Sequence, residues 1–429
     1  MAEYKLLSKG ILLDGTGPQS RENMDVLIKG KYIEAVGLHG TVKYPEEAEV
    51  IDCSGHVIMP GLIDAHLHLF GRKVMSHTVQ ICEDPILRGM RSVLDAWRLI
   101  DAGYTTVRDC TSGNGIPLRN FIAEGEMIGP RILACGLALS QTGGHGELMH
   151  SVPVEFSNRG LTCRLADGVS EVRKAAREQL RAGADFIKIY TSGGVMSEYG
   201  SSQECQYSLE EIQACAEEAH NRGVRTAAHA QGRMGIINAA KGGIDSIEHG
   251  VYMDDEGLEL ILKNKCFLVP TISIFNVMKN KGAACGMPDY KIRKAEQLIE
   301  VQLKSFRRAY EAGVVCGLGS DFLSDSSMTP MGGNIVEVVD YVERAGLSVG
   351  ETIVCATGNN AKILGIDDVT GTIEAGKCAD ILVVEKEMLT DIRVIADRTR
   401  IMKIYKEGED VPRLNIEKFR RFDCHELFQ

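Results

Sequence analysis

The sequence lacks the features of a secreted, membrane-spanning or nucleic-acid-binding protein. Its 13 cysteines are scattered over 429 residues without a C-x-x-C pair, which indicates free thiols in a reducing compartment. No apolar run approaches about 18 residues, and the N-terminus has no basic stretch before an apolar core, so neither a membrane span nor a signal peptide is predicted. A net charge of -11 disfavours a phosphate-backbone partner. We therefore expect a cytoplasmic protein that binds neither membranes nor nucleic acids.

The composition is that of an ordinary folded protein, with 44% hydrophobic and 25% charged residues. Its 429 residues are enough for one large domain and a smaller one. Both ends of the chain predict strands separated by turns, at residues 5–13, 25–28, 32–36, 49–52, 381–384 and 400–405. We expect the two ends, residues 1–56 and 366–429, to pair into one small β-sandwich domain.

The middle of the chain, residues 57–365, alternates between apolar runs and amphipathic stretches. Most of the stretches predict helices, such as those at residues 169–183, 209–222, 234–242 and 255–263, and one of them begins with a capping box formed by Ser208 and Glu211. Eight runs predict strands, at residues 57–68, 105–108, 131–139, 186–190, 225–230, 246–249, 267–271 and 314–318. Eight strands that alternate with helices predict an α/β fold, namely a (β/α)8 TIM barrel with its site at the C-terminal ends of the strands. The competing doubly wound sheet lacks its G-x-G-x-x-G motif.

The first of these runs, PGLIDAHLHL, carries two histidines at its end. In an extended strand His66 and His68 point to the same side, as two ligands of one metal must. The pattern alone is also compatible with a strand end that carries two solvated histidines.

Polar residues recur at the ends of later strands. His229, His249 and Asp321 each close an apolar run, and Lys188 lies inside one. Each histidine alone is compatible with a hydrogen-bonded rim residue, and Asp321 with a helix N-cap. Lys188 is harder to explain, because burying an ammonium without a partner costs several kcal/mol. Their shared position at strand tips favours one common site.

This set of residues resembles the amidohydrolase superfamily of metal-dependent (β/α)8 barrels. His66 and His68 match its H-x-H motif, and Lys188 matches a lysine that becomes carboxylated and bridges two metals. His229, His249 and Asp321 match the remaining ligands. The resemblance covers the whole chain and implies two Zn²⁺ ions per chain, one held by His66, His68 and Asp321 and the other by His229 and His249.

Two further motifs are similar to those of the imidazolonepropionase-like Xaa-Pro dipeptidase and carboxypeptidase-like group. They are SQTGGHG at residues 140–146 and KIYTSGGV at residues 188–195. Imidazolonepropionase itself is similar but lacks the bridging lysine, so Lys188 argues against that activity. The resemblance implies that metal-bound hydroxide attacks an amide carbonyl and that Asp321 passes its proton to the leaving amine. It also implies oxyanion stabilisation by His145. Tyr190 lies two residues after Lys188, so in a strand it faces the same cavity and is placed to bind a substrate carboxylate or the oxyanion; rim packing is an equal alternative.

We therefore expect a metal-dependent hydrolase of C–N bonds whose substrate is a dipeptide or an N-acyl amino acid, including ochratoxin-like amides. The sequence leaves the group that binds the substrate carboxylate unassigned; Arg108 and Arg233 lie near strand tips. The alternative substrate is a cyclic amide or urea, as for imidazolonepropionase or phenylurea hydrolases. A non-catalytic scaffold would have lost ligands, and none is missing. The fold also favours a homo-oligomer.

Overall fold

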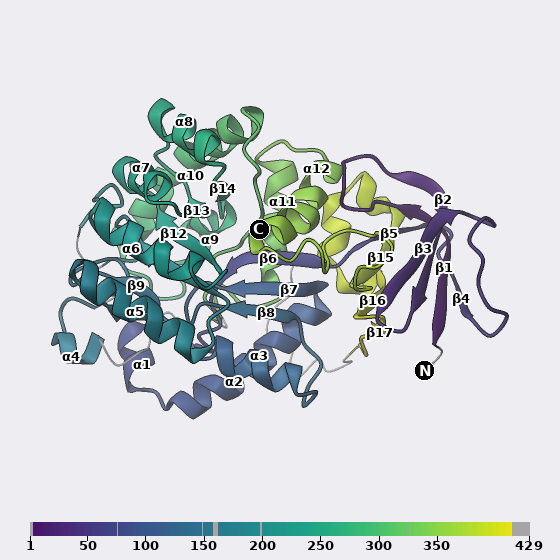
Figure 1. Ribbon diagram of the computed structural model, residues 1–429, viewed down its shortest axis with the longest axis horizontal. Helices are drawn as coiled ribbons and strands as arrows, with labels where there is room; N and C mark the ends of the chain where they lie inside the picture. The colour runs from purple at the N-terminus through teal and green to yellow at the C-terminus, as the bar shows by residue number, and fades with distance from the viewer. Residues whose placement is uncertain are drawn as a thin grey trace.

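Strands from both ends of the chain form one sheet, which lies beside a larger α/β region (Figure 1). The computed structural model describes residues 3–74, 76–147, 149–157, 162–197, 200–325 and 327–413. Within these residues no helix is both long and apolar enough to cross a membrane. The twelve cysteines among them are all free thiols, as the sequence predicts.

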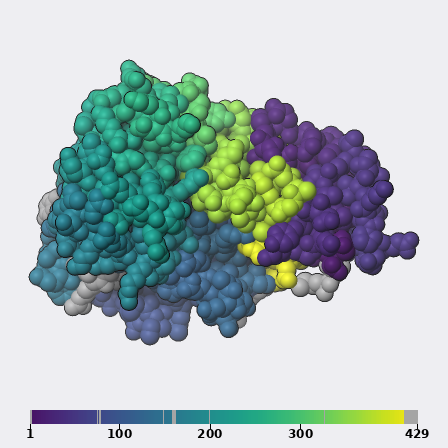
Figure 2. Space-filling model, viewed as in Figure 1, coloured from purple at the N-terminus to yellow at the C-terminus, as the bar shows by residue number. Residues whose placement is uncertain are grey.

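The terminal sheet has eight strands in the order β17-β16-β15-β5-β1-β2-β3, with β4 paired to β1. Strand β5 lies parallel to β1 and antiparallel to β15, so it joins the two ends of the chain. In Figure 2 the purple N-terminal strands accordingly abut the yellow-green C-terminal part. The strands are β1 (Tyr4–Leu12), β2 (Arg21–Lys29), β3 (Tyr32–Leu38), β4 (Glu49–Asp52), β5 (His56–Pro60), β15 (Ile381–Glu385), β16 (Ile401–Lys406) and β17 (Glu409–Asp410).

The larger region is built from parallel strands in two sheets, β6-β7-β8 and β10-β9-β11-β12-β13-β14. Backbone hydrogen bonds join the sheets into a ring: Asp185 donates to Ala134, Gly317 to Leu268, and Ala65 to Leu318. These bonds complete the predicted barrel. Its strands are β6 (Leu62–Leu67), β7 (Tyr104–Asp109), β8 (Arg131–Ala134), β9 (Ala138–Ser140), β11 (Phe186–Tyr190), β12 (Arg225–Ala230), β13 (Ser246–His249) and β14 (Phe267–Val269). Strand β10 (Cys163–Leu165) pairs with β9 at the edge of the second sheet.

Helices cover the outside of the barrel (Figure 1). The capping box predicted at Ser208 is present and begins α6. The helices are α1 (His77–Cys82), α2 (Pro85–Asp101), α3 (Gly115–Ala123), α4 (Val154–Ser157), α5 (Gly168–Ala182), α6 (Leu209–His220), α7 (Arg233–Lys241), α8 (Asp255–Asn264), α9 (Ser273–Lys281), α10 (Asp289–Glu311), α11 (Val336–Glu343), α12 (Val349–Val354) and α13 (Asn360–Leu364). Short 3-10 or π turns lie at Gly333–Ile335, Cys355–Asn359, Lys386–Leu389, Ile392–Ala396 and Arg398–Arg400.

Three predicted strands differ from the observed ones. The run at residues 57–68 is two strands, because β5 joins the terminal sheet and only β6 enters the barrel. The run at residues 131–139 is divided between β8 and β9 at Gly136, whose φ of 68° breaks the extended backbone. The eighth run contributes isolated bridges, such as the one between Cys316 and Leu268, in place of a regular strand.

Candidate metal centre

One cavity brings all the predicted site residues together at the C-terminal ends of the barrel strands. It is lined by His66, His68, His145, Lys188, Tyr190, His229, His249 and Asp321, with apolar side chains around them. The parallel register explains part of this convergence: Tyr190 pairs with His229 across β11 and β12, and Ala230 pairs with His249 across β12 and β13. Side chains more than 250 positions apart in sequence thus share one wall, as the barrel fold requires.

His66, His68 and Asp321 form the first half of the candidate centre. The Oδ1 atom of Asp321 lies 3.0 Å from His68 Nε2 and 3.4 Å from His66 Nε2. One ligand atom from each residue lies within 4.8 Å of the other two, a spacing that a single cation can bridge. The opposite ring nitrogens are held by the protein, since Nδ1 of His66 is 2.6 Å from Glu248 Oε2 and Nδ1 of His68 is 3.2 Å from the Thr111 carbonyl.

Lys188, His229 and His249 form the second half. The rings of His229 and His249 are 4.5 Å apart between centroids, and His249 lies 5.0 Å from His66. His249 Nδ1 is held 2.7 Å from the hydroxyl of Thr271, whereas His229 Nε2 lies 3.2 Å from the Gly193 carbonyl. The two halves therefore meet at the contact between His66 and His249.

The amine of Lys188 sets this cluster apart from an ordinary polar core. The side chain is 1% exposed, and none of the described residues offers its Nζ atom a hydrogen-bond partner. A buried ammonium without partners is strongly unfavourable. A metal pair bridged through a modified Lys188 would remove that cost, so the residues present fit the group that the family implies.

The protonation states of His229, His249 and Asp321 suit metal binding. Burial lowers the pKa values of His229 and His249 well below the usual imidazole value, and neighbouring histidines and Lys188 lower them further. Burial acts to raise the pKa of Asp321, but hydrogen bonds from His66 and His68 outweigh it and hold that pKa well below its usual value. Neutral imidazole and ionised carboxylate are the forms that bind metals. For His66, burial acts to lower the pKa, but Cys110 and a hydrogen bond with Asp321 raise it well above the usual imidazole value, so metal binding there would displace a proton.

The backbone is strained where the strands deliver these ligands. His249 has a φ of 71° and Asp321 a φ of 56°, a left-handed conformation that costs a non-glycine residue about 1–2 kcal/mol. Such strain persists where the surrounding structure enforces it, and it clusters at functional sites.

His145 and Tyr190 stand beside the second half. Their rings make an edge contact at 5.4 Å, and the His145 ring lies 4.3 Å from that of His229. Two glycines make room for them: a Cβ on Gly194 would lie 2.5 Å from His145 Nε2, and one on Gly146 would lie 2.6 Å from Tyr190 Cε2. The glycine-rich motifs noted in the sequence thus place these two rings at the cavity.

The sequence did not indicate the residues that orient His66. Glu248 is fully buried and accepts hydrogen bonds from His66 Nδ1, from Arg108 Nη2 at 2.7 Å and from the Ser246 hydroxyl at 2.6 Å. Both carboxylate oxygens are therefore engaged, although His66, Cys110 and Glu248 also lie close enough to hold a metal. The one local signal was the position of Glu248 directly before His249.

Asp64 was also missed. Its buried carboxylate accepts from the backbone of His66 and Ser320, from the Ser320 hydroxyl and from Asn334 Nδ2. It thereby joins β6 to the turn that carries Asp321.

Neither arginine suggested by the sequence faces the cavity. Arg108 lies inside the barrel, where it donates to the Ala65 carbonyl, Ser246 and Glu248. Arg233 is 44% exposed and pairs with Asp254 and Glu256. A third arginine, Arg72, does line the cavity.

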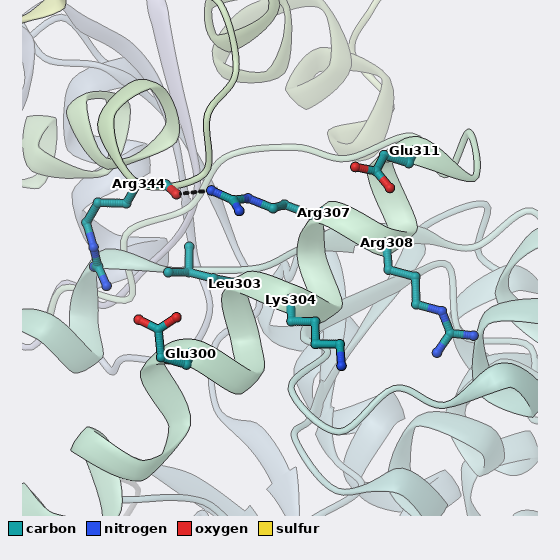
Figure 3. Close-up of a pocket in the computed structure, with 7 residues that line it drawn as sticks. All are labelled: Glu300, Leu303, Lys304, Arg307, Arg308, Glu311 and Arg344. Atoms are coloured by element: carbon teal, nitrogen blue, oxygen red, sulfur yellow. Dashed lines mark hydrogen bonds between the residues drawn. The ribbon is translucent and has the colours of Figure 1, made fainter.

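A second hollow lies along α10 (Figure 3) and shares no lining residue with this cavity. It is lined by Glu300, Leu303, Lys304, Arg307, Arg308, Glu311 and Arg344. Arg307 donates to the backbone of Arg344 and Ala345, and Arg308 pairs with Asp255. It contains none of the predicted ligands, so the candidate centre is the cavity in the barrel.

Comparisons with known proteins agree with this geometry. The sequence pattern of the Amidohydrolase family matches residues 57–411. Ochratoxinase from Aspergillus niger is 32% identical, over 95% of this chain and 86% of its own, and its crystal structure aligns with a TM-score of 0.86 over 95% of both chains. The structure of a Xaa-Pro dipeptidase with bound methionine is 32% identical, with a TM-score of 0.85 over 95% of this chain and 99% of that one. The chain therefore belongs to the amidohydrolase family, hydrolases that act on C–N bonds.

Proposed function

We propose that this protein is a binuclear zinc amidohydrolase that cleaves the amide bond of a dipeptide or an N-acyl amino acid, including ochratoxin-like amides. One observation carries the proposal: the buried Lys188 amine has no hydrogen-bond partner among the described residues and lies among four histidines and Asp321. The similarity to ochratoxinase and to the Xaa-Pro dipeptidase supports the substrate class.

In this proposal His66, His68 and Asp321 hold one cation, and His229 and His249 hold the other. Carboxylation of Lys188, in which its nitrogen bonds to carbon dioxide and loses a proton, would give a carbamate that could help to hold both metals. Bound zinc would polarise the scissile carbonyl and supply hydroxide at neutral pH.

Asp321 is assigned to transfer the proton, and His145 and Tyr190 are assigned to donate hydrogen bonds to the substrate. Asp321 is 20% exposed at the side chain, and its Oδ1 faces the two histidines, so Oδ2 is the oxygen assigned to take a proton and deliver it to the leaving amine. We assign the Ser197 hydroxyl, 2.6 Å away, as the donor to His145 Nδ1, which leaves the proton on Nε2 for the oxyanion. Burial raises the pKa of Tyr190 well above its usual value, so its hydroxyl remains a donor.

Two measurements test the proposal. Metal analysis of the purified protein should find about two zinc ions per chain. A screen of dipeptides and N-acyl amino acids against cyclic amides and ureas should find turnover in the first group. Turnover confined to cyclic amides or ureas would favour the alternative substrate class, and a metal-free protein without turnover would overturn the proposal. The homo-oligomer remains a prediction, which light scattering of the purified protein would test.

A further inference from the structure

The cavity wall continues beyond His68 as a ladder of side chains. The chain leaves β6 after Leu67, and His66, His68, Phe70 and Arg72 all line the cavity. The rings of His68 and Phe70 are stacked, 5.2 Å apart with an angle of 8° between them. The guanidinium of Arg72 lies over the Phe70 ring, 4.2 Å from its centroid. The Arg72 guanidinium is thus connected to His68 of the candidate centre through the Phe70 ring, which contacts both.

The position of Arg72 is defined by its surroundings. Gly71 has a φ of 62°, and a Cβ at that position would collide with the Arg88 carbonyl, so the turn requires glycine. Arg72 itself is 3% exposed. Burial lowers its pKa to about 9, while the buried Asp325 acts in the opposite direction, so the side chain stays charged at neutral pH.

Apart from Thr162 and Gln231, the remaining wall of the cavity is apolar. It is formed by residues of α9, of the loop after β11 and of the segment after Asp321, namely Val195, Met196, Phe275, Met278 and Leu323. A cavity that combines a metal-binding floor, one guanidinium and an apolar wall suits a ligand with one carboxylate and one apolar group. Arginine is also the side chain best shaped to bind a carboxylate with two parallel hydrogen bonds.

We infer that Arg72 binds the free carboxylate of the substrate and makes the enzyme selective for amides of apolar amino acids over neutral amides. The inference rests on the proposed function. Neither Arg108 nor Arg233 lines this cavity: Arg108 lies inside the barrel against Glu248, and Arg233 pairs with Asp254 at the surface.

The test compares an acid with its matched amide. N-benzoyl-L-phenylalanine and its C-terminal carboxamide are offered to the zinc-loaded wild type, Arg72→Met and Arg72→Lys. We expect the wild type to prefer the acid, and Arg72→Met to lose about 10- to 100-fold in kcat/KM for the acid but to change little for the carboxamide. Arg72→Lys should recover part of the loss, because it restores the charge but not the paired geometry. Arg233→Met serves as the control, since it removes an arginine outside the cavity.

A binding measurement separates this inference from the proposed function. Calorimetry with 3-phenylpropanoate and 3-phenylpropanamide reports carboxylate recognition even if neither benzoyl substrate is cleaved. Binding of the acid that weakens about 10- to 100-fold in Arg72→Met, with unchanged zinc content and melting temperature, supports the inference. Equal losses for acid and amide, or equal binding of the acid by wild type and Arg72→Met, would overturn it and leave the hydrolase assignment intact.

Discussion

The two halves of the candidate centre differ in how far the protein holds them in place. In the half made by His66, His68 and Asp321, each imidazole has a carboxylate or carbonyl behind it, and both face Asp321. In the other half His249 is held by Thr271, but His229 rests on the Gly193 carbonyl and Lys188 has no described hydrogen-bond partner. The side chains of the first half are thus held in place by the protein itself, whereas in the proposed function the second half depends on carboxylation of Lys188 and on metal binding.

Replacing Lys188 should have the largest effect. We expect Lys188→Ala to lose both zinc occupancy and turnover, because the proposed bridge between the halves disappears. Elemental analysis and kcat/KM with the best substrate measure the two losses. Short carboxylates such as propionate should partly restore both, since they fit the vacated volume and offer two oxygens. Retention of both metals in this variant would show that the bridge is assigned wrongly.

Glu248→Gln tests the organisation of the first half. The amide keeps the shape but removes the charge that accepts from His66 and Arg108. We expect zinc affinity, measured by competition with a chelator, to fall about 10- to 100-fold. Glu256→Gln, which changes an exposed glutamate on the surface, should leave it unaltered. Unchanged affinity in Glu248→Gln would mean that His66 does not depend on this contact.

Gly194→Ala tests the placement of His145. The added methyl would lie within 2.5 Å of the imidazole, so the ring must move away from its position beside His229. We expect kcat to fall about 100- to 1,000-fold, as for the loss of an oxyanion donor, while zinc content stays the same. Gly89→Ala, at an open position in α2, is the matched control. A variant with full activity would exclude His145 from the oxyanion role.

The smallest effect is expected from Glu337, which holds the segment next to Thr271, the hydrogen-bond partner of His249. Glu337 accepts from the backbone of Ile272 and Ser273 at 2.7 Å, next to Thr271, and burial raises its pKa from 4.5 to about 8. The folded state thus binds a proton that the unfolded state releases near pH 4.5. Its contribution to stability is complete below that pH and is lost as the pH rises through about 8.

We therefore expect the unfolding free energy of the wild type to fall between pH 5 and 8 relative to Glu337→Gln, by at most about 1.4 kcal/mol per pH unit. Urea denaturation of both proteins across this range measures the difference. Parallel pH profiles would show that Glu337 does not titrate in this way.

Much of the fold followed from local patterns. The terminal strands and the helices α5 to α8 lie within a few residues of their predicted positions, because alternation, helical periodicity and caps are properties of neighbouring residues. The break at Gly61 was missed, since it depends on β5 pairing with β15 while β6 pairs with β7, and the break at Gly136 was missed because no local pattern indicated its positive φ. The six predicted metal ligands lie on one cavity, as their positions near strand ends predict, and His145 and Tyr190 lie on it too; the chemical roles of all eight stay predictions.

The sequence by itself determined which side chains arrive at the barrel mouth, because the end of a strand and the side on which a residue points are set by the residues around it. Only the tertiary structure decided which distant residues hold these side chains in place by hydrogen bonds. Glu248 reaches His66 across 182 positions, and Asp64 reaches Asn334 across 270. It also placed Arg72 on the cavity while turning Arg108 inward, because the direction of a long side chain depends on neighbours that no local pattern specifies.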